Sequence, residues 1–176
     1  MSWKQVFTFI ALAIAFFMGD ALLKAYIHHD IPTISSSTSI YPYGGIKVFR
    51  NWHGIEFSIV HVINKGAAWG IFASLQEYLL YARVAIVGGL LTYLFFIKAS
   101  AYRKFCLTLI TTGALGNVVD YFVYGHVVDM FYFVFWGFSY PVFNIADSVI
   151  FVGIMLLLLE TLWLKMRSAR SLKSKA

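Results

Sequence analysis

Asp129 and Asp147 are the residues of this sequence best placed to do chemistry. They are 18 residues apart and flank what we predict to be the return loop between two membrane spans, so their side chains can meet at one end of a helical bundle. Two carboxylates in a low-dielectric site share one proton, because both cannot ionise easily. Such a pair can activate a water and protonate a scissile carbonyl, which is peptide hydrolysis without a covalent intermediate. Alternatively, the aspartates cap helices or pair charges, and Asp147 could complement the dipole of its helix.

Further polar side chains occur where the chain is otherwise apolar. Asp20 and Lys24 share a helix face at positions i and i+4 and can form an ion pair or orient a polar group in a site. Asn117 and Asp120, at i and i+3, share another face, and Asn144 lies one helical turn before Asp147. Buried polar groups need polar partners, so we expect these residues to meet.

The composition requires a membrane around these residues. Of the 176 residues, 60% are hydrophobic and 12% are charged, which is too little polar surface for a soluble domain. Four segments are long and apolar enough to cross a bilayer as helices. They cover about residues 6–26, 78–97, 105–124 and 143–164 of a single membrane domain, residues 1–176.

The basic residues predict the orientation of the spans. The net charge of +6 comes mostly from the amino terminus, the loop at 98–104 and the carboxy-terminal tail, which indicates topology and no nucleic-acid site. We therefore expect both termini in the cytoplasm. An extracytoplasmic cap of about 27–77, with β structure over 55–64 after a Ser/Thr tract at 35–39, and an aromatic interfacial loop of about 125–141 would then face outward.

Five blocks of residues together resemble bacterial lipoprotein signal peptidase, or signal peptidase II. They are Asp20-Ala-Leu-Leu-Lys24, Asn64-Lys-Gly66-Ala-Ala-Trp69-Gly70, Gly113-Ala-Leu-Gly116-Asn117-Val-Val-Asp120, Val127-Val-Asp129 and Phe143-Asn144-Ile-Ala146-Asp147-Ser148. They follow the order of that family over most of the chain. The resemblance implies a bundle of four transmembrane helices with a small extracytoplasmic β-cradle, in the bacterial inner membrane with the active site facing outward.

The resemblance also implies the reaction and the site. The family removes signal peptides from diacylglyceryl-modified prolipoproteins, cutting before the lipidated cysteine, with an aspartic dyad that corresponds to Asp129 and Asp147. Expected substrate-binding or site-shaping residues are Asp20, Lys24, Asn64, Gly66, Asn117, Asp120 and Asn144. The implied partners are the lipid-modified precursor and membrane lipid, and we expect a monomer with no metal and no organic cofactor.

Two positions depart from the family pattern. Tyr121 stands where the family usually has Arg, and Leu23 stands where a hydroxyl residue usually precedes the lysine. Neither belongs to the expected dyad, but both lie beside residues expected to shape the site.

Other readings of the same residues remain open. Ser58 or Ser148 with Lys24 or Lys65 could form a serine/lysine site, although no Gly-x-Ser-x-Gly motif supports it. Buried aspartates could instead relay protons in a small transporter or accessory subunit. We interpret the histidines as interfacial or surface residues because they lack metal-ligand spacing. Trp69 is expected at the interface or lining the cradle, and Arg83 is expected to reach outward to water or lipid phosphate.

Overall fold

Four long helices dominate the computed structural model, which describes residues 2–34, 40–66 and 73–173. The helices are α1 (Trp3–Asp30), α2 (Gln76–Phe96), α3 (Ala101–Tyr124) and α4 (Ile145–Lys173), and a 3-10 turn, η2 (Ala73–Leu75), precedes α2. All four are long and apolar enough to cross a membrane. The predicted fold class of four spans with a small sheet is confirmed, although α1 and α4 extend beyond the predicted ends. The Ser/Thr tract at 35–39 and Trp69 lie outside the described residues.

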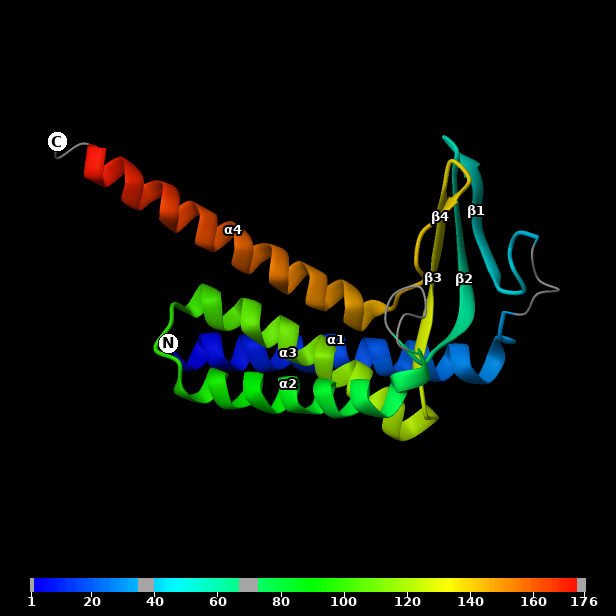
Figure 1. The fold of residues 1–176 in the computed structure, drawn as a ribbon, viewed down its shortest axis with the longest axis horizontal. Coiled ribbons are helices and arrows are strands. Elements are labelled where there is room, and N and C mark those ends of the chain that lie inside the picture. Colours follow the sequence, from blue (N-terminus) through cyan, green and yellow to red (C-terminus); the bar gives the residue numbers. More distant parts are fainter. Residues whose placement is uncertain (1, 35–39, 67–72, 174–176) are drawn as a thin grey trace.

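The helices and the sheet occupy opposite ends of the molecule (Figure 1). Helices α1, α2 and α3 run side by side, whereas α4 diverges from them with distance from the sheet. The start of α1, the end of α4 and the α2–α3 connection lie at the end away from the sheet. The sheet therefore covers only one mouth of the bundle, and that mouth is where the chain returns from α3 to α4.

Glycines allow α4 to approach α3 closely near the sheet. A side chain on Gly113 would overlap the carbonyl of Ala146, and one on Gly153 would lie 2.9 Å from the carbonyl oxygen of Cys106. Backbones in a membrane bundle approach this closely only through small residues. These two close contacts hold the start of α4, and the part of α4 around Gly153, against α3.

The sheet is antiparallel with the order β1-β2-β3-β4. Its strands are β1 (Ile46–Trp52), β2 (Ile55–Asn64), β3 (Val127–Phe135) and β4 (Phe138–Ser139). The segment that the sequence predicted as an interfacial loop at 125–141 thus forms two strands. Its β-branched and aromatic residues have high strand propensity, and pairing with β2 satisfies backbone groups that a loop would leave open.

The two faces of β3 point in different directions, because side chains alternate along a strand. Asp129 pairs with Val62 of β2 and shares its face with Phe131 and Phe133. On the opposite face, Val128 and Met130 pack with Ile27 of α1 in a fully buried apolar cluster. This packing places the Asp129 carboxylate toward the start of α4.

Candidate active site

Asn144 and Asp147 begin helix α4 with a reciprocal pair of hydrogen bonds. The Asp147 backbone N–H donates to Asn144 Oδ1 at 2.8 Å, and the Asn144 backbone N–H donates to Asp147 Oδ2 at 3.2 Å. This is a capping box, which satisfies backbone donors at a helix start. The alternative role of Asp147 as a helix-capping residue is therefore real, and the same bonds hold its carboxylate in one orientation.

Asp129 lies on β3 within reach of the same asparagine. Its carboxylate accepts hydrogen bonds from the amides of Asn64 and Asn144, each at 2.8 Å. Asp129 is 2% exposed. Burial, with the charge of Asp147 as a second cause, raises the pKa of Asp129 from its ordinary 3.8 to about 7, against the lowering effect of the two amide bonds. Asn144 thus binds both aspartates, one through its side chain and one through its backbone.

Asn117 of α3 joins the aspartates to a buried charge cluster. Its amide nitrogen donates to Asp147 Oδ1 at 2.8 Å. Its amide oxygen accepts from Asn144 Nδ2 at 3.1 Å and from Lys24 Nζ at 3.0 Å. The amide thus donates one hydrogen bond and accepts two, and a flipped amide would lose all three.

Lys24 is the centre of the charge cluster and has no exposed surface. Its ammonium lies 2.6 Å from Asp20 and 2.7 Å from Asp120, and Asn117 accepts its third N–H. Asp20 in turn accepts from the backbone N–H of Ala146 at 2.9 Å, in the first turn of α4. The cluster therefore ties α1, α3 and the start of α4 together.

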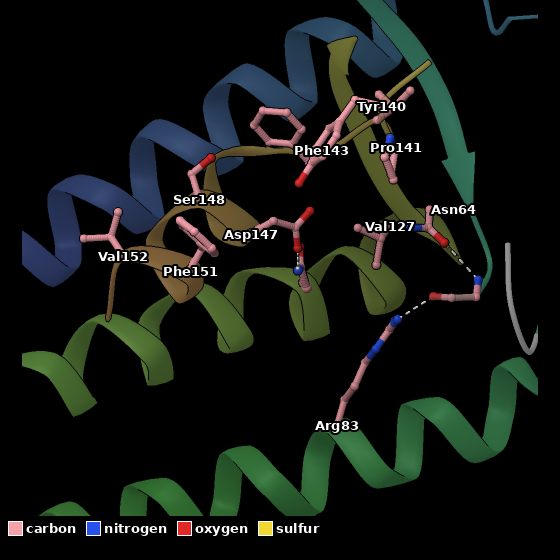
Figure 2. A pocket seen from close by; sticks show the side chains of 13 residues that line it. Asn64, Arg83, Val127, Tyr140, Pro141, Phe143, Asp147, Ser148, Phe151 and Val152 are labelled. Carbon is pink, nitrogen blue, oxygen red and sulfur yellow. Dashed lines mark hydrogen bonds between the residues drawn. The ribbon is translucent and has the colours of Figure 1, made fainter. Parts of the chain in front are cut away.

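A pocket of about 600 Å³ opens beside the network (Figure 2). Its polar lining includes Asn64, Asn117 and Asp147, whereas Phe151 and Val152 of α4 form an apolar wall. Arg83 reaches toward it from α2, on the side opposite α4. Asp129 is not among the lining residues, but it accepts a hydrogen bond from Asn64, which is. An elongated apolar segment with one reactive amide would fit this lining.

Gly66 and Arg83 close the sheet side of the pocket. The Gly66 backbone N–H donates to Asn64 Oδ1 at 2.9 Å, and Arg83 donates to the Gly66 carbonyl at 2.7 Å. Arg83 therefore has a protein carbonyl as a partner, and its contact with water or lipid phosphate stays a prediction. Sequence reasoning also missed the lining residues from 140 to 143, which no spacing signal distinguished from the surrounding apolar residues.

All nine residues expected in the site belong to one connected network. The connections run from Gly66 through Asn64, Asp129, Asn144 and Asn117 to Lys24, with Asp20, Asp120 and Asp147 attached. The sequence places them in five separate blocks, and the fold brings every block to the same mouth of the bundle.

The two departures from the family pattern lie away from the dyad. Leu23 packs against the apolar cluster of Ile27, Val128 and Met130, so the site around Lys24 adds a hydrophobic contact in place of a hydroxyl group. The Tyr121 ring lies edge-on to Phe122 with centroids 6.0 Å apart. Its ring thus contributes an aromatic contact at the sheet end of α3.

The interpretation of the histidines as surface residues is wrong for His61 and His126. Their exposed fractions are 3% and 8%. His61 is buried because β2 pairs with β3 on one side, and His126 is buried at the junction of α3 with β3. The sequence could not show this, because burial here depends on a strand pairing between residues far apart in the chain.

The fold and the site define a multi-pass membrane protein with a polar centre at one mouth, and comparison with known proteins agrees with the fold. The family model described as signal peptidase (SPase) II matches residues 12–163. Lipoprotein signal peptidase of Chlamydia pneumoniae is 41% identical over 110 residues, 61% of this chain and 66% of that protein. The Chlamydia abortus protein of the same name is 33% identical over 159 residues, covering 89% and 92%.

Solved structures give the same result. A bacterial membrane enzyme structure determined by the in meso method at 2.3 Å superposes with a TM-score of 0.74 at 26% identity, covering 89% of this chain and 88% of that one. A second such structure, at 1.9 Å, gives 0.71. The chain belongs to the signal peptidase II family, and it is a multi-pass protein of the bacterial inner membrane.

Proposed function

We propose that this protein is an aspartic endopeptidase that removes signal peptides from diacylglyceryl-modified prolipoproteins, cutting before the lipidated cysteine, with Asp129 and Asp147 as the catalytic residues. Family membership supports the activity. The observation that carries the residue assignment is Asn144, whose side chain donates to Asp129 while its backbone donates to Asp147. One residue thus holds two acidic groups at a shared position.

The pair supports hydrolysis by a water molecule. The two carboxyl groups share one proton near neutral pH, because burial raises the pKa of Asp129 to about 7 and two neighbouring carboxylates cannot both ionise easily. We assign this proton to Asp129, the acid, and the ionised state to Asp147, the base, which lines the pocket. Asp147 removes a proton from the water as its oxygen bonds to the scissile carbonyl carbon, and Asp129 protonates the carbonyl oxygen. When the C–N bond breaks, Asp147 returns its proton to the leaving amine, and Asp129 recovers one from the diol. Both carboxyl groups then regain their starting states.

The other residues of the network position this pair. Asn64, Asn117 and Asn144 fix the carboxylates, and Lys24 with Asp20 and Asp120 fixes the helices that carry them. The apolar wall of the pocket suits the signal peptide. Phe133, which stacks on Phe57 at 4.3 Å, continues the Asp129 face of β3 as an apolar surface for the lipid-modified end of the precursor.

The proposed orientation puts the sheet and the aspartates outside the cytoplasm and both termini inside. Basic residues gather at the end of the bundle away from the sheet, which supports this topology. We propose that the protein works as a monomer, since the network that holds the dyad is complete within one chain. Single-cysteine variants in a Cys106→Ala background test the topology: Ser139→Cys should react with an impermeant thiol reagent from outside, whereas Ser168→Cys should be protected.

The rival readings have less support. In the described residues, the three oxygen partners of Lys24 are two carboxylates and an amide, and Ser148 donates to the carbonyl of Asn144. Neither contact activates a serine. For a proton relay, polar groups would have to continue across the bundle, whereas this network is confined to the mouth near the sheet.

The deciding experiment compares Asp129→Asn and Asp147→Asn with Asp30→Asn in a cleavage assay on a lipid-modified precursor. Asp30 is exposed at the end of α1, outside the network, and is the matched control. We expect the two dyad variants to lose activity by about 10²–10⁴-fold or more, because each removes an acid–base group. Thermal unfolding in detergent verifies that each is folded. Normal cleavage by a folded Asp129→Asn or Asp147→Asn protein would refute the assignment.

A further inference from the structure

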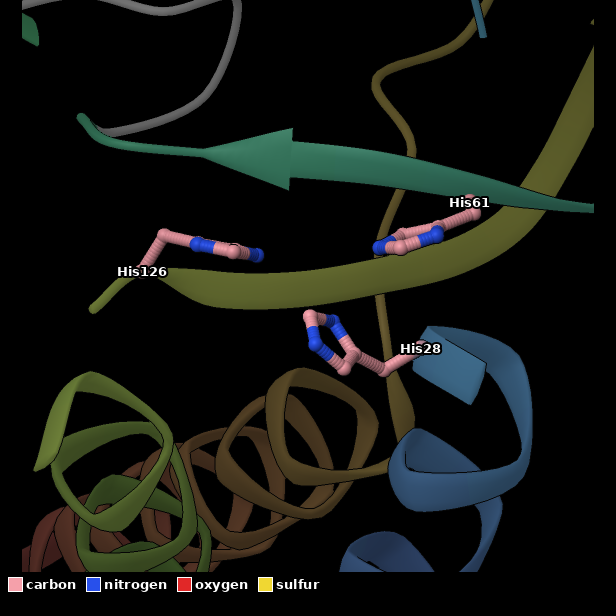
Figure 3. A group of neighbouring side chains, drawn as sticks. All are labelled: His28, His61 and His126. Atoms are coloured by element: carbon pink, nitrogen blue, oxygen red, sulfur yellow. The ribbon is translucent and has the colours of Figure 1, made fainter. Parts of the chain in front are cut away.

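Three histidines from distant parts of the chain converge beside the sheet, away from the proposed dyad (Figure 3). His28 is in the last turn of α1, His61 is on β2, and His126 lies between α3 and β3. One ring nitrogen from each lies within 4.8 Å of the others. His61 directly precedes Val62, the partner of Asp129, so strand alternation puts His61 on the opposite face of the sheet.

Two of these rings have a buried nitrogen without a protein partner. Within the described residues, Nε2 of His61 and Nε2 of His126 make no hydrogen bond, although both side chains are more than nine-tenths buried. An unpaired buried polar atom costs free energy, so each such atom needs an explanation. A bound cation that both nitrogens ligate would explain both unpaired atoms at once.

The His61 ring is already oriented for that role. Its Nδ1 lies 2.8 Å from the carbonyl oxygen of Ile31, which can only accept, so Nδ1 carries the hydrogen and the lone pair is on Nε2. Metal-bound imidazoles characteristically donate their other N–H to a carbonyl in this way.

We propose that His28, His61 and His126 bind one divalent transition-metal ion, with Zn²⁺ as the defining case. Three imidazoles are a zinc ligand set, whereas Ca²⁺ and Mg²⁺ prefer oxygen. Zinc–nitrogen bonds of about 2.0–2.1 Å bring ligand atoms to about 3.4 Å from each other in a tetrahedron. Rotation of the exposed His28 side chain closes the remaining distance, and the same exposure gives the ion a path to the site.

The bound ion would stabilise the fold and take no part in hydrolysis. It would join the outer end of α1 to β2 and to the residue that precedes β3, the strand that carries Asp129. Tyr124 supports the arrangement, since its ring centroid lies 4.5 Å from that of His28. Metal binding does not depend on the proposed protease activity, so the Asp129→Asn variant should bind the ion as the wild type does.

The experiment is a zinc titration of the purified full-length protein in detergent, without a polyhistidine tag, against a chromophoric chelator at neutral pH. We expect one Zn²⁺ per chain and a raised midpoint of thermal unfolding that EDTA reverses. His28→Ala should weaken binding at least tenfold, and His61→Ala should do the same. His29→Ala, which changes the exposed neighbour of His28 on the same helix, should bind as the wild type does.

The exposed position of His28 keeps the test decisive even if His61→Ala fails to fold. X-ray absorption of the zinc-loaded protein should show three imidazole nitrogens in the first coordination sphere. Less than half an equivalent bound at micromolar free zinc, or equal affinity in His28→Ala and His29→Ala, would overturn the proposal.

Discussion

The two faces of the sheet differ in how their buried polar groups are hydrogen-bonded. On one face, the Asp129 carboxylate accepts two amide hydrogen bonds and is linked onward to Lys24. On the other, beyond the apolar packing of Val128 and Met130, His61 and His126 leave a ring nitrogen unpaired within the described residues. One face is complete without a ligand, whereas the other becomes complete when a ligand binds.

This difference predicts which substitutions each face can tolerate. A network whose members are all hydrogen-bonded holds its groups in one geometry, and the loss of one member leaves charged or polar partners buried and unpaired. A cluster with unpaired atoms loses little when those atoms are removed. The effects of substitutions on the two faces should therefore differ, both in how much stability is lost and in whether cleavage is lost with it.

The largest effect is expected from Lys24→Met. The substitution leaves Asp20 and Asp120 buried without their cation, and breaking a buried ion pair in this way costs about 3–5 kcal/mol. Unfolding in detergent should show this loss, together with the loss of cleavage. Lys65→Met, at an exposed position near the site, should change stability by no more than about 0.5 kcal/mol. Partial recovery in Lys24→Met/Asp120→Asn would locate the cost in the charge cluster.

Asn144→Ala should separate the capping of α4 from the alignment of the dyad. Ser100→Ala is its matched control, because Ser100 caps α3 without contacting the site. Ser100→Ala should lose about 1 kcal/mol of stability through the missing cap. Asn144→Ala should lose more, because it also leaves Asp129 and Asn117 without its amide. Only Asn144→Ala should also lower kcat, by about 10²-fold, since it releases both aspartates. Equal kcat in the two variants would show that the bridge does not position the dyad.

The cleavage rate should fall as the pH rises above about 7. Burial raises the pKa of Asp129 to about 7, so its acidic proton is lost above that pH, and kcat should drop about tenfold per unit. The folded pKa exceeds the unfolded value of 3.8. Protonation of Asp129 therefore favours folding fully below about pH 4, and this contribution is lost as the pH rises through about 7. A flat rate between pH 7 and 9 would contradict the assigned proton.

The smallest effect is expected on the histidine face when metal is absent. His126→Phe replaces a ring that has an unpaired buried nitrogen with an apolar ring of similar shape. In the presence of EDTA, the stability should change by less than about 1 kcal/mol. Cleavage should persist, measured with the same precursor. A loss comparable to that of Lys24→Met would mean that the two faces are equally intolerant.

The membrane spans and the polar site were predictable from the sequence, because both signals are local. Apolar runs of bilayer length define the helices, and polar residues at helical spacing within an apolar chain mark the groups that must find partners. Asp20 with Lys24 and Asn117 with Asp120 are such pairs. Their connection through Asn144 was not predictable, because it depends on the side chain and the backbone of one residue bonding to different elements.

The sheet was only half predictable. The segment 55–64 shows strand character by its β-branched residues, and β2 forms there. The composition of the aromatic segment after α3 fits either an interfacial loop or a strand. Only its pairing with β2 shows that it is a strand. The histidine cluster follows from the same pairing, so its residues carry no sequence signal at all.

The bridge made by Asn144 ties the geometry of the proposed dyad to the insertion of α4. The two acidic groups come from strand β3 and from helix α4, and the backbone N–H of Ala146, at the start of α4, donates to Asp20, 126 residues earlier. Under the proposed function, a nascent chain whose fourth span has not yet inserted lacks the paired carboxyl groups and should not cut a peptide bond. The proposed protease would thereby stay inactive toward neighbouring proteins in the membrane until its fourth span is in place.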